Sequence, residues 1–439
     1  MLSKLVKLCS WSSLTIFRWL LMSVMLIIAI NLKNPHLLAY RQYETAFLLI
    51  FPVFGIAVYL RRHRNLERLI AINLLSVILM LTLYGEFIFQ YRKKVVLNTD
   101  QLIARQLGEH FVVGYDKQDE IQTLIRKGLV GGIFITQHNA AGKSFNDLSK
   151  EIRELQALKK ETGLQKLIVA TDQEGGIVSR LSPPLNQQPA LAALADGQYT
   201  TAELLSKAEA YGKQQGYALA NLGVTVNFSP VVDLKSDRTD DPLDFHSLIN
   251  QRAISIQPAL TAEVAQAYVR GLESQGVNAT LKHFPGLGHV ADDTHHFSAK
   301  LDMPLSELDT HDWIPFKQIA EHSNALIMLG HVILTQEDSE NPVSFSHDVV
   351  QNIIRDTWKF DGVLITDDMT MAAAYNHGIC DAAVKSLNAG VDLLLVSYDY
   401  DKFYEVMYCA LRAFENGELN RNWINHSHKR LAYLVQPKT

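Results

Sequence analysis

The chain has 439 residues, a formal net charge of −5 at pH 7 and three cysteines. With a net negative charge, the chain lacks the basic character that nucleic-acid binding requires, so we expect no nucleic-acid partner. Three cysteines without CxxC spacing are too few for a disulfide framework. They do not indicate whether the protein resides in an oxidising or a reducing compartment. Residues 14–89 are dominated by Leu, Ile, Phe, Val and Ala, whereas the sequence beyond Tyr91 is typical of a soluble protein. The composition therefore divides the chain into residues 1–94 and 95–439.

The first part contains three apolar blocks, and flanking residues extend each toward the roughly 20 apolar residues that span a bilayer. Aromatic residues such as Trp19, Tyr40 and Tyr91 stand at their ends, as interfacial anchors do. We predict a membrane anchor of about three transmembrane helices that has the lipid bilayer as its partner. A cleaved signal peptide would explain only the first block, and a soluble bundle would need a polar face. The blocks are 19–32 (WLLMSVMLIIAINL), 45–60 (TAFLLIFPVFGIAVYL) and 69–84 (LIAINLLSVILMLTLY).

The cations around these blocks predict an orientation in the membrane. One side of the membrane would hold six cations, namely Lys4, Lys7 and the four arginines of 61–68. The other side would hold five, namely Lys33, Arg41 and 92–94 (RKK). Cytoplasmic loops carry an excess of Lys and Arg, and the count here is six against five. We therefore expect a multi-pass inner-membrane protein with the large domain on the periplasmic, extracytoplasmic side.

From residue 95 onward, eight short apolar runs alternate with amphipathic helical stretches such as 201–222 and 259–275. Such alternation predicts parallel strands with crossover helices. Eight repeats in about 340 residues fit one (β/α)8 barrel of the TIM type, with a doubly wound open sheet as the alternative. The predicted strands are 110–114, 131–135, 167–171, 224–228, 277–281, 325–329, 362–365 and 391–396.

Polar residues follow five of these runs. Asp172 comes after the third strand, Asp233 shortly after the fourth, Lys282 and His283 after the fifth, His331 after the sixth, and Asp367 and Asp368 after the seventh. Carboxyl ends of barrel strands converge on one face, where active sites are built. The sequence therefore predicts an active site on this face.

The stretch 282–296 (KHFPGLGHVADDTHH) holds four histidines and two adjacent aspartates. Three of these side chains could bind zinc, but the chain has no HExxH motif and no second set of paired His ligands. A solvated polar loop is another possibility. The third is acid–base chemistry on a sugar, in which a carboxylate nucleophile faces a proton donor across the ring. We predict no metal and no cofactor.

Asp367 is the better candidate for the nucleophile because it comes directly after its strand, which fixes the backbone. A helix N-cap is the structural alternative for this residue. Asp368 alternates to the other side of an extended chain, so we expect it to bond locally. Asp293 lies two residues from His295, which lets the carboxylate orient the imidazole and lets His295 donate and recover a proton near neutral pH.

Five motifs, taken together and in order, resemble the bacterial β-N-acetylglucosaminidases of glycoside hydrolase family 3. They are 172–176 (DQEGG), 227–233 (NFSPVVD), 282–286 (KHFPG), 293–295 (DTH) and 366–367 (TD). The resemblance covers about residues 99–439. It implies a single-domain barrel that removes terminal β-linked N-acetylglucosamine by a retaining path without metal or cofactor, typically in peptidoglycan turnover.

Carried over by position, the resemblance makes Asp367 the nucleophile and Asp293 with His295 the acid/base dyad. Four further positions match residues of the family that bind the sugar: Asp172, Lys282, His283 and Arg252, the arginine of 250–253 (NQRA). Leu287 and Ile177 depart from the family pattern, which commonly has His and Arg there, so the aglycone preference stays open. The resemblance covers none of the predicted membrane anchor.

Two residues near the site keep two interpretations. We expect Glu174 to satisfy backbone N–H groups within its turn rather than to act as a general acid, and His331 is equally compatible with lining the site and with packing. Competing functions are a β-N-acetylglucosaminide phosphorylase that uses the same site, a non-catalytic membrane-tethered sugar-binding protein, and a metal-dependent hydrolase. An intact set of Asp367, Asp293 and His295 argues for an enzyme.

Overall fold

The computed structural model describes residues 2–61, 65–236, 248–290 and 299–434, and it divides into two compact units, residues 1–95 and 96–439. Each unit has its own hydrophobic core, so each is described by itself. The assignment of residues 1–94 to a membrane anchor stays a prediction, and so do the limits 95–439 of the glycoside hydrolase domain.

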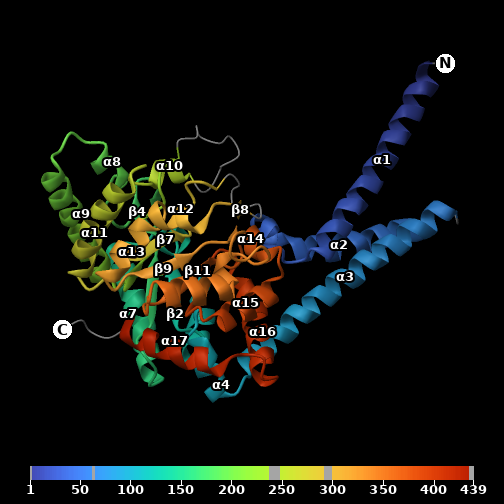
Figure 1. Cartoon of the computed structure of the whole chain (residues 1–439). Helices are drawn as coiled ribbons and strands as arrows, with labels where there is room; N and C mark the ends of the chain where they lie inside the picture. The colour runs from blue at the N-terminus through green and yellow to red at the C-terminus, as the bar shows by residue number, and fades with distance from the viewer. Residues whose placement is uncertain (1, 62–64, 237–247, 291–298, 435–439) are drawn as a thin grey trace. The chain divides into compact units, whose positions relative to one another are not determined.

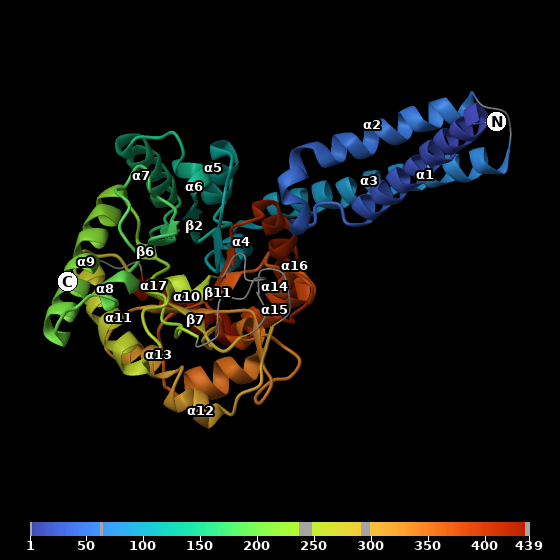
Figure 2. The same cartoon turned by 90° about the horizontal axis from the view of Figure 1, so that it is seen from above.

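The first unit consists of α1 (Leu2–Ile30), the short 3₁₀ helix η1 (Pro35–Tyr40), α2 (Arg41–Leu60) and α3 (Leu66–Leu97). The helices run side by side in alternating directions (Figure 2), and their shared core includes Met25, Leu48 and Ile78. Among the described residues, two segments, Pro35–Leu60 and Leu66–Leu97, are long and apolar enough to cross a membrane, and Thr15–Ile30 is a shorter apolar helix. The structure therefore supplies two candidate spans where the sequence predicted three.

The second unit is an α/β domain built on a parallel sheet of eight strands among its described residues, in the order β6-β3-β2-β1-β12-β11-β9-β7. Isolated parallel bridges link each edge strand to residues beside the other, Val226 of β6 with Asn278 and Lys282 of β7 with Val231, and nearly close the sheet into a barrel. This result confirms the predicted parallel α/β architecture and excludes the open sheet. The strands are β1 (Phe111–Val113), β2 (Gly132–Ile135), β3 (Ile168–Thr171), β6 (Val226–Asn227), β7 (Thr280–Phe284), β9 (Leu326–Leu329), β11 (Leu364–Asp368) and β12 (Leu393–Val396).

Helices surround this sheet (Figures 1 and 2) and connect successive parallel strands, as crossovers must. Their ends carry the expected signals: α9 begins with a capping box of Thr200 and Glu203 and ends at Gly223, whose φ of +105° suits glycine. The crossover elements are α5 (Gln118–Arg126), α6 (Gln137–Ala140), α7 (Phe145–Glu161), α9 (Thr201–Leu222), α10 (Ile249–Arg252), α11 (Pro258–Glu273), α12 (Leu305–Thr310), α13 (Ile314–Glu321), the π-helix η3 (Val349–Thr357), α14 (Ala372–Tyr375) and α15 (Ile379–Ala389). A further helix, α16 (Phe403–Glu415), follows the last strand, β12.

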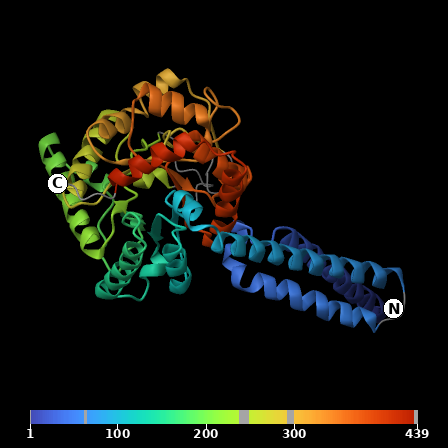
Figure 3. The same ribbon diagram turned by 90° about the horizontal axis from the view of Figure 1, so that it is seen from below.

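One end of the barrel is closed by α4 (Gln101–Gly108) and α17 (Arg421–Leu434) (Figure 3). Leu431 of α17 joins the barrel core, where Phe134 and Phe228 stack with ring centroids 5.3 Å apart. His428 of α17 bonds the Gln106 carbonyl of α4. This end carries the amino termini of the strands, so the opposite end is open for a site.

Small additional elements build the open end. β4 (Gln173–Gly175) and β5 (Val178–Ser179) form a hairpin after β3, and β8 (Ala299–Leu301) pairs with β10 (Val332–Leu334). Two further turns of 3₁₀ helix, η2 (Val343–Phe345) and η4 (Tyr400–Lys402), and one short helix, α8 (Ala192–Ala195), complete the described elements.

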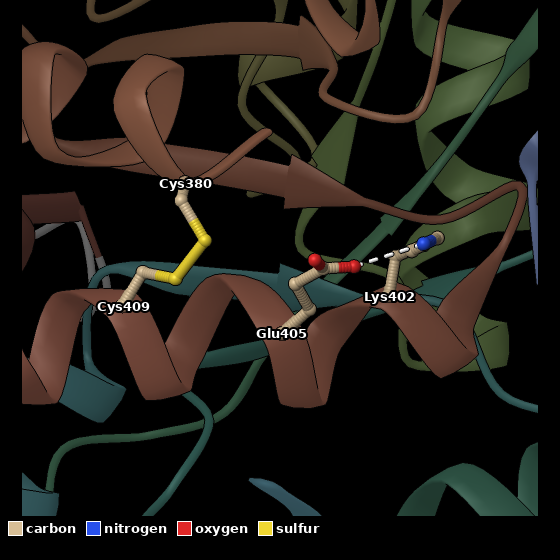
Figure 4. The surroundings of a disulfide bond; sticks show 4 residues. All are labelled: Cys380, Lys402, Glu405 and Cys409. Carbon is tan, nitrogen blue, oxygen red and sulfur yellow. Dashed lines mark hydrogen bonds and ion pairs between the residues drawn. A yellow bond between two sulfur atoms is a disulfide. The ribbon is translucent and has the colours of Figure 1, made fainter. Parts of the chain in front are cut away.

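A disulfide joins Cys380 of α15 to Cys409 of α16, with the Cα atoms 5.4 Å apart (Figure 4). The two cysteines lie 29 residues apart, and the loop that the disulfide closes contains β12. At the start of α16, its N-cap residue Lys402 forms an ion pair with Glu405 at 2.8 Å. The spacing of the cysteines in the sequence did not predict this pairing.

Candidate active site

A buried ionic network occupies the open end between β3 and β7. The Lys282 ammonium lies 2.5 Å from Asp172 and 2.6 Å from Glu174, and the Arg252 guanidinium donates two hydrogen bonds to Glu174 at 2.9 and 2.6 Å. Asp172 follows β3 directly, whereas Lys282 lies on β7. The Asp172 side chain is 21% exposed and the other three are at most 9% exposed, so Asp172 is the member most accessible to a ligand.

The charge of Glu174 is stabilised strongly within this network. Burial alone would raise the pKa of Glu174, but the Arg252 and Lys282 cations outweigh it and lower that pKa to about 2. Burial likewise opposes the Arg252 cation, but Glu174 leaves the pKa of Arg252 raised. Glu174 therefore acts as a permanent counter-ion. Our expectation that this side chain would bond backbone N–H groups was wrong, because the two cations lie within its reach.

Asp233 holds His283 in place. Its carboxylate accepts hydrogen bonds from the backbone N–H of His283 at 3.1 and 3.0 Å and from that of Leu287 at 2.8 Å. Its Oδ2 also lies 2.7 Å from Nδ1 of the His283 ring. When Nδ1 carries the proton, Nε2 of His283 is the ring atom left to meet a ligand. Asp233 thus fixes both the backbone and the ring of His283.

The end of β11 carries Asp367 and Asp368 as the last two residues of the strand. Asp368 Oδ2 accepts hydrogen bonds from the backbone N–H of Ser397 and of Tyr398, at 3.0 and 2.6 Å, and from the Ser397 hydroxyl at 2.5 Å. Its Oδ1 accepts two from Thr370 at 2.8 and 2.7 Å. The expectation that Asp368 bonds locally is confirmed, and its bonds to the end of β12 add a second anchor.

Asp367 is half-buried, and its Oδ1 accepts a hydrogen bond from the backbone N–H of Asp368 at 2.8 Å. The next helix, α14, begins at Ala372 with Met371 at its N-cap position, so Asp367 does not cap a helix. The rigid neighbour on its carboxyl side and the strand on its amino side fix the backbone of Asp367. A carboxylate held this way is suited to attack at a defined position.

His331 connects the two sides of the open end. Its Nδ1 lies 2.7 Å from the Ser344 hydroxyl and its Nε2 lies 2.9 Å from the backbone oxygen of Asp368. The ring is buried, and Gly330 before it lies against the His283 side chain. These bonds favour the structural interpretation of His331, with the ring supporting the end of β11.

A pocket opens beside the ionic network. Glu174, Arg252 and Ser229 supply its polar wall, and Gly175 and Ala190 leave space in it. Position 175 requires glycine, because its φ is +95° and a Cβ there would collide with the Tyr211 hydroxyl and the Pro189 carbonyl oxygen. The pocket therefore combines charged hydrogen-bonding groups with small residues, as sites for small polar ligands do.

The structure brings together Asp172, Arg252, Lys282 and, through Asp233, His283. Lys282 and His283 lie on β7 itself, because the strand runs to Phe284 and not to Leu281 as predicted. Asp293 and His295 lie outside the described residues. Among the described side chains, no group of three His, Cys, Asp or Glu residues is arranged to hold a metal ion.

Comparison with known proteins agrees with this geometry. Residues 99–434 match the family described as Glycosyl hydrolase family 3 N terminal domain. The chain belongs to glycosyl hydrolase family 3. A curated Beta-hexosaminidase of Pseudomonas aeruginosa is 35% identical over 287 residues, which are 64% of this chain and 79% of that protein. One from Nitrosomonas eutropha is 33% identical over 284 residues, 64% of this chain and 77% of the relative.

A solved family 3 beta-N-acetylglucosaminidase from Paenibacillus sp. str. FPU-7 has the same fold, with a TM-score of 0.68 and 30% identity. The alignment covers 75% of this chain and 61% of that one, so our chain spans less than two thirds of that enzyme. Together these relatives identify the chain as a glycoside hydrolase. They also confirm the resemblance inferred from the five sequence motifs.

Sequence reasoning missed the distant partners of three carboxylates in this family 3 domain. Glu174, Asp233 and Asp368 each hold a neighbouring site residue through several hydrogen bonds. Their position beside strand ends was visible in the sequence. What these carboxylates bond was not visible, because every partner of theirs except Thr370 lies at least 29 residues away.

Proposed function

We propose that the chain is a retaining exo-β-N-acetylglucosaminidase that removes terminal β-linked N-acetylglucosamine, with peptidoglycan fragments as its source. The observation that carries the proposal is the arrangement of Asp172, Lys282 and Arg252 in one network, with Asp367 on the same open end of the barrel. The names of the family 3 relatives support the sugar.

Asp367 would act as the nucleophile and form a covalent glycosyl-aspartate intermediate. Attack by its carboxylate on the anomeric carbon breaks the glycosidic bond, and water then releases the sugar with the original configuration. Asp293 would orient His295, which donates a proton to the leaving oxygen and then accepts one from the attacking water.

The ionic network would bind the sugar. Asp172 is the exposed acceptor for hydroxyl groups, and Lys282 and Arg252 donate to oxygen atoms of the ring substituents. Because Glu174 and Asp172 together balance the charges of Lys282 and Arg252, the pocket would bind a neutral sugar without a large excess of positive charge. The Nε2 atom of the His283 ring would donate a hydrogen bond to the sugar or accept one from it.

The first test is turnover of aryl β-N-acetylglucosaminide by the full chain in mild detergent, beside Asp367→Ala and His295→Ala. Asp367→Ala should abolish turnover, and His295→Ala should lower it on the order of 10²–10⁴-fold when the leaving group needs protonation. Proton NMR of the first product should find the β anomer. Asp361→Ala, an exposed aspartate near the amino end of β11, is the matched control and should keep wild-type activity.

Two outcomes contradict the proposal. An α-anomeric first product would exclude the retaining path, and full activity of Asp367→Ala would exclude this nucleophile. Repeating the assay with phosphate tests the phosphorylase alternative, which requires sugar phosphate as the product.

We further propose that the first unit anchors the enzyme in the inner membrane as a multi-pass segment. Large apolar side chains stay exposed along its helices, including Ile50 at 64%, Phe54 at 68% and Leu69 at 56%. Exposed apolar surface of this extent suits a lipid environment better than water. Two of its acidic residues are paired with cations: Glu44 contacts Arg41 at 3.2 Å, and Glu86 contacts Lys33 at 3.5 Å.

The catalytic domain would face the extracytoplasmic side. The disulfide between Cys380 and Cys409 supports this side, because structural disulfides persist in oxidising compartments and are rare in the cytosol. The cation count of the helical unit points the same way but by a single residue. The two arguments are independent, since one concerns the catalytic unit and the other the helical unit.

Thiol labelling of whole cells tests the orientation. After labelling under denaturing conditions with a maleimide polymer, the wild-type chain should shift by one label without reductant and by three with it. Three labels without reductant would place the domain in a reducing compartment and overturn the orientation. A Cys9→Ser chain should take up no label without reductant, which would identify Cys9 as the single reactive thiol.

A further inference from the structure

The turn between α12 and α13 contacts the chain just before the segment that carries Asp293 and His295. Asp312 in this turn is 1% exposed, and its two carboxylate oxygens face two different histidines. Its Oδ1 lies 3.1 Å from Nδ1 of His289, and its Oδ2 lies 3.3 Å from Nδ1 of its neighbour His311. The His289 and His311 rings lie 5.8 Å apart between centroids. One buried carboxylate is thus held between two half-exposed imidazoles.

A second contact joins the same turn to the same segment. The Trp313 indole donates a hydrogen bond to the Pro285 carbonyl at 3.1 Å, and its ring stacks on Phe284 with centroids 5.7 Å apart. Between these contacts, Gly286 has a φ of +106°, and a Cβ there would lie 3.2 Å from Cβ of Asp312. Asp312 and Trp313 therefore pack directly against the backbone that leaves β7.

The opposite side of this backbone is also fixed. The Leu287 N–H donates to Asp233 at 2.8 Å, so residues 285–289 are held by Asp233 on one side and by Asp312 and Trp313 on the other. After the segment, Ala299–Leu301 of β8 pairs in parallel with Val332–Leu334 of β10. Both described ends of the chain around residues 291–298 are therefore attached to rigid elements.

We propose that Asp312 is a positioning residue for the acid/base step, acting through His289 on the amino-terminal attachment of the segment that carries Asp293 and His295. This inference rests on the proposed function. The physical reason is that proton transfer requires the donor within hydrogen-bond reach of the leaving oxygen, and a shift of about 1 Å costs on the order of 10²-fold in rate. Burial of the Asp312 carboxylate makes its contact with His289 stronger than a surface pair.

The proposal predicts a defect that depends on the leaving group. In a retaining enzyme, kcat/KM reports the step in which the aglycone leaves. A dinitrophenyl group leaves without a proton, whereas the sugar aglycone of chitobiose needs one. Loss of Asp312 should therefore affect chitobiose and spare the dinitrophenyl glycoside, which still needs Asp367 and the sugar pocket.

The experiment compares Asp312→Asn and Asp312→Ala in the full chain with both substrates. Asp312→Asn should lower kcat/KM for chitobiose at least tenfold and that for the dinitrophenyl glycoside less than threefold. Asp309→Asn is the matched control, because Asp309 lies three residues earlier, is 46% exposed and pairs with Lys317 at 2.8 Å. It should leave both values unchanged.

The ratio of the two kcat/KM values does not depend on how much of a variant is folded, so partial unfolding cannot imitate the result. An equal fall with both substrates would assign Asp312 a purely structural role and overturn the proposal, and so would unchanged values. Wild-type turnover of the dinitrophenyl glycoside tests the proposed function separately, since that substrate does not need the acid.

Discussion

Glu174 and Arg252 lie 78 residues apart in the chain and form a bidentate pair, with N–O distances of 2.9 and 2.6 Å. The same carboxylate contacts Lys282 at 2.6 Å, so one anion from the β4–β5 hairpin orients one cation from α10 and one from strand β7. Planar bidentate pairs fix direction as well as distance. The proposed sugar-binding face of the site is therefore positioned by Glu174, which can do so without touching the sugar.

Replacing Glu174 by glutamine should destabilise the catalytic domain by about 3 kcal/mol, because two buried cations lose their shared counter-ion. Denaturant unfolding followed by tryptophan fluorescence measures this change. The matched control is Glu209→Gln, which breaks an Arg–Glu pair with Arg270 whose side chains are each 51% exposed. It should cost less than about 1 kcal/mol. Equal costs would mean that burial of the Glu174 pair contributes nothing.

Asp368→Asn should lower kcat with little change in KM, because Asp368 fixes the strand end next to the proposed nucleophile and both of its carboxylate oxygens are occupied by protein donors. Its carboxylate accepts five hydrogen bonds, and an amide would place N–H groups against the donors of Ser397 and Tyr398. A loss of about 1–3 kcal/mol in the positioning of Asp367 corresponds to roughly 5- to 150-fold in kcat. Steady-state kinetics at saturating substrate measures it. A rise in KM alone would show that Asp368 serves binding instead.

His110 should make the domain less stable in acid. Burial and, second, the nearby His428 lower the pKa of His110 from 6.5 to about 4, so the folded state keeps the ring neutral where the unfolded chain is protonated. Its contribution to stability is fully present above pH 6.5 and is lost as the pH falls toward 4. Between pH 7.5 and pH 5 this one group should remove about 2 kcal/mol.

Unfolding curves at both pH values, for wild type and His110→Gln, isolate this effect. The glutamine amide can still donate to the Asp392 carbonyl, which lies 2.8 Å from Nδ1 of His110, but it does not titrate. The difference between the two proteins should shrink in acid by about 2 kcal/mol. A constant difference across this range would contradict the assignment.

Removal of the disulfide by Cys380→Ser with Cys409→Ser should destabilise the domain by about 3–4 kcal/mol, the loop entropy expected for a 29-residue separation. Thermal unfolding measures the loss, and reduction of the wild-type chain should reproduce it. Cys9→Ser is the control and should leave the unfolding of the domain unchanged. A reduced wild-type chain as stable as the oxidised one would contradict this prediction.

The fold class and most of the barrel were predictable from the sequence. Alternating apolar runs and helical stretches specify parallel strands joined by crossovers, and α9 begins and ends at the predicted residues, Thr201 and Leu222. Strand limits were less predictable, since β7 extends to Phe284 and carries Lys282 and His283 within it. A buried parallel strand can include polar residues when partners from other strands bond them, and no local pattern reveals that.

The sequence by itself determined which residue types stand at the strand ends, because motifs such as DQEGG and TDD are local. Tertiary structure alone decided what those residues bond. Glu174 meets Arg252 and Lys282, and Asp312 meets His289, across separations of 78, 108 and 23 residues. The pairing of Cys380 with Cys409 also could not be predicted from their spacing, because it depends on the packing of α15 against α16. Local patterns follow from backbone periodicity, whereas pairing of distant side chains depends on the closed sheet that brings them together.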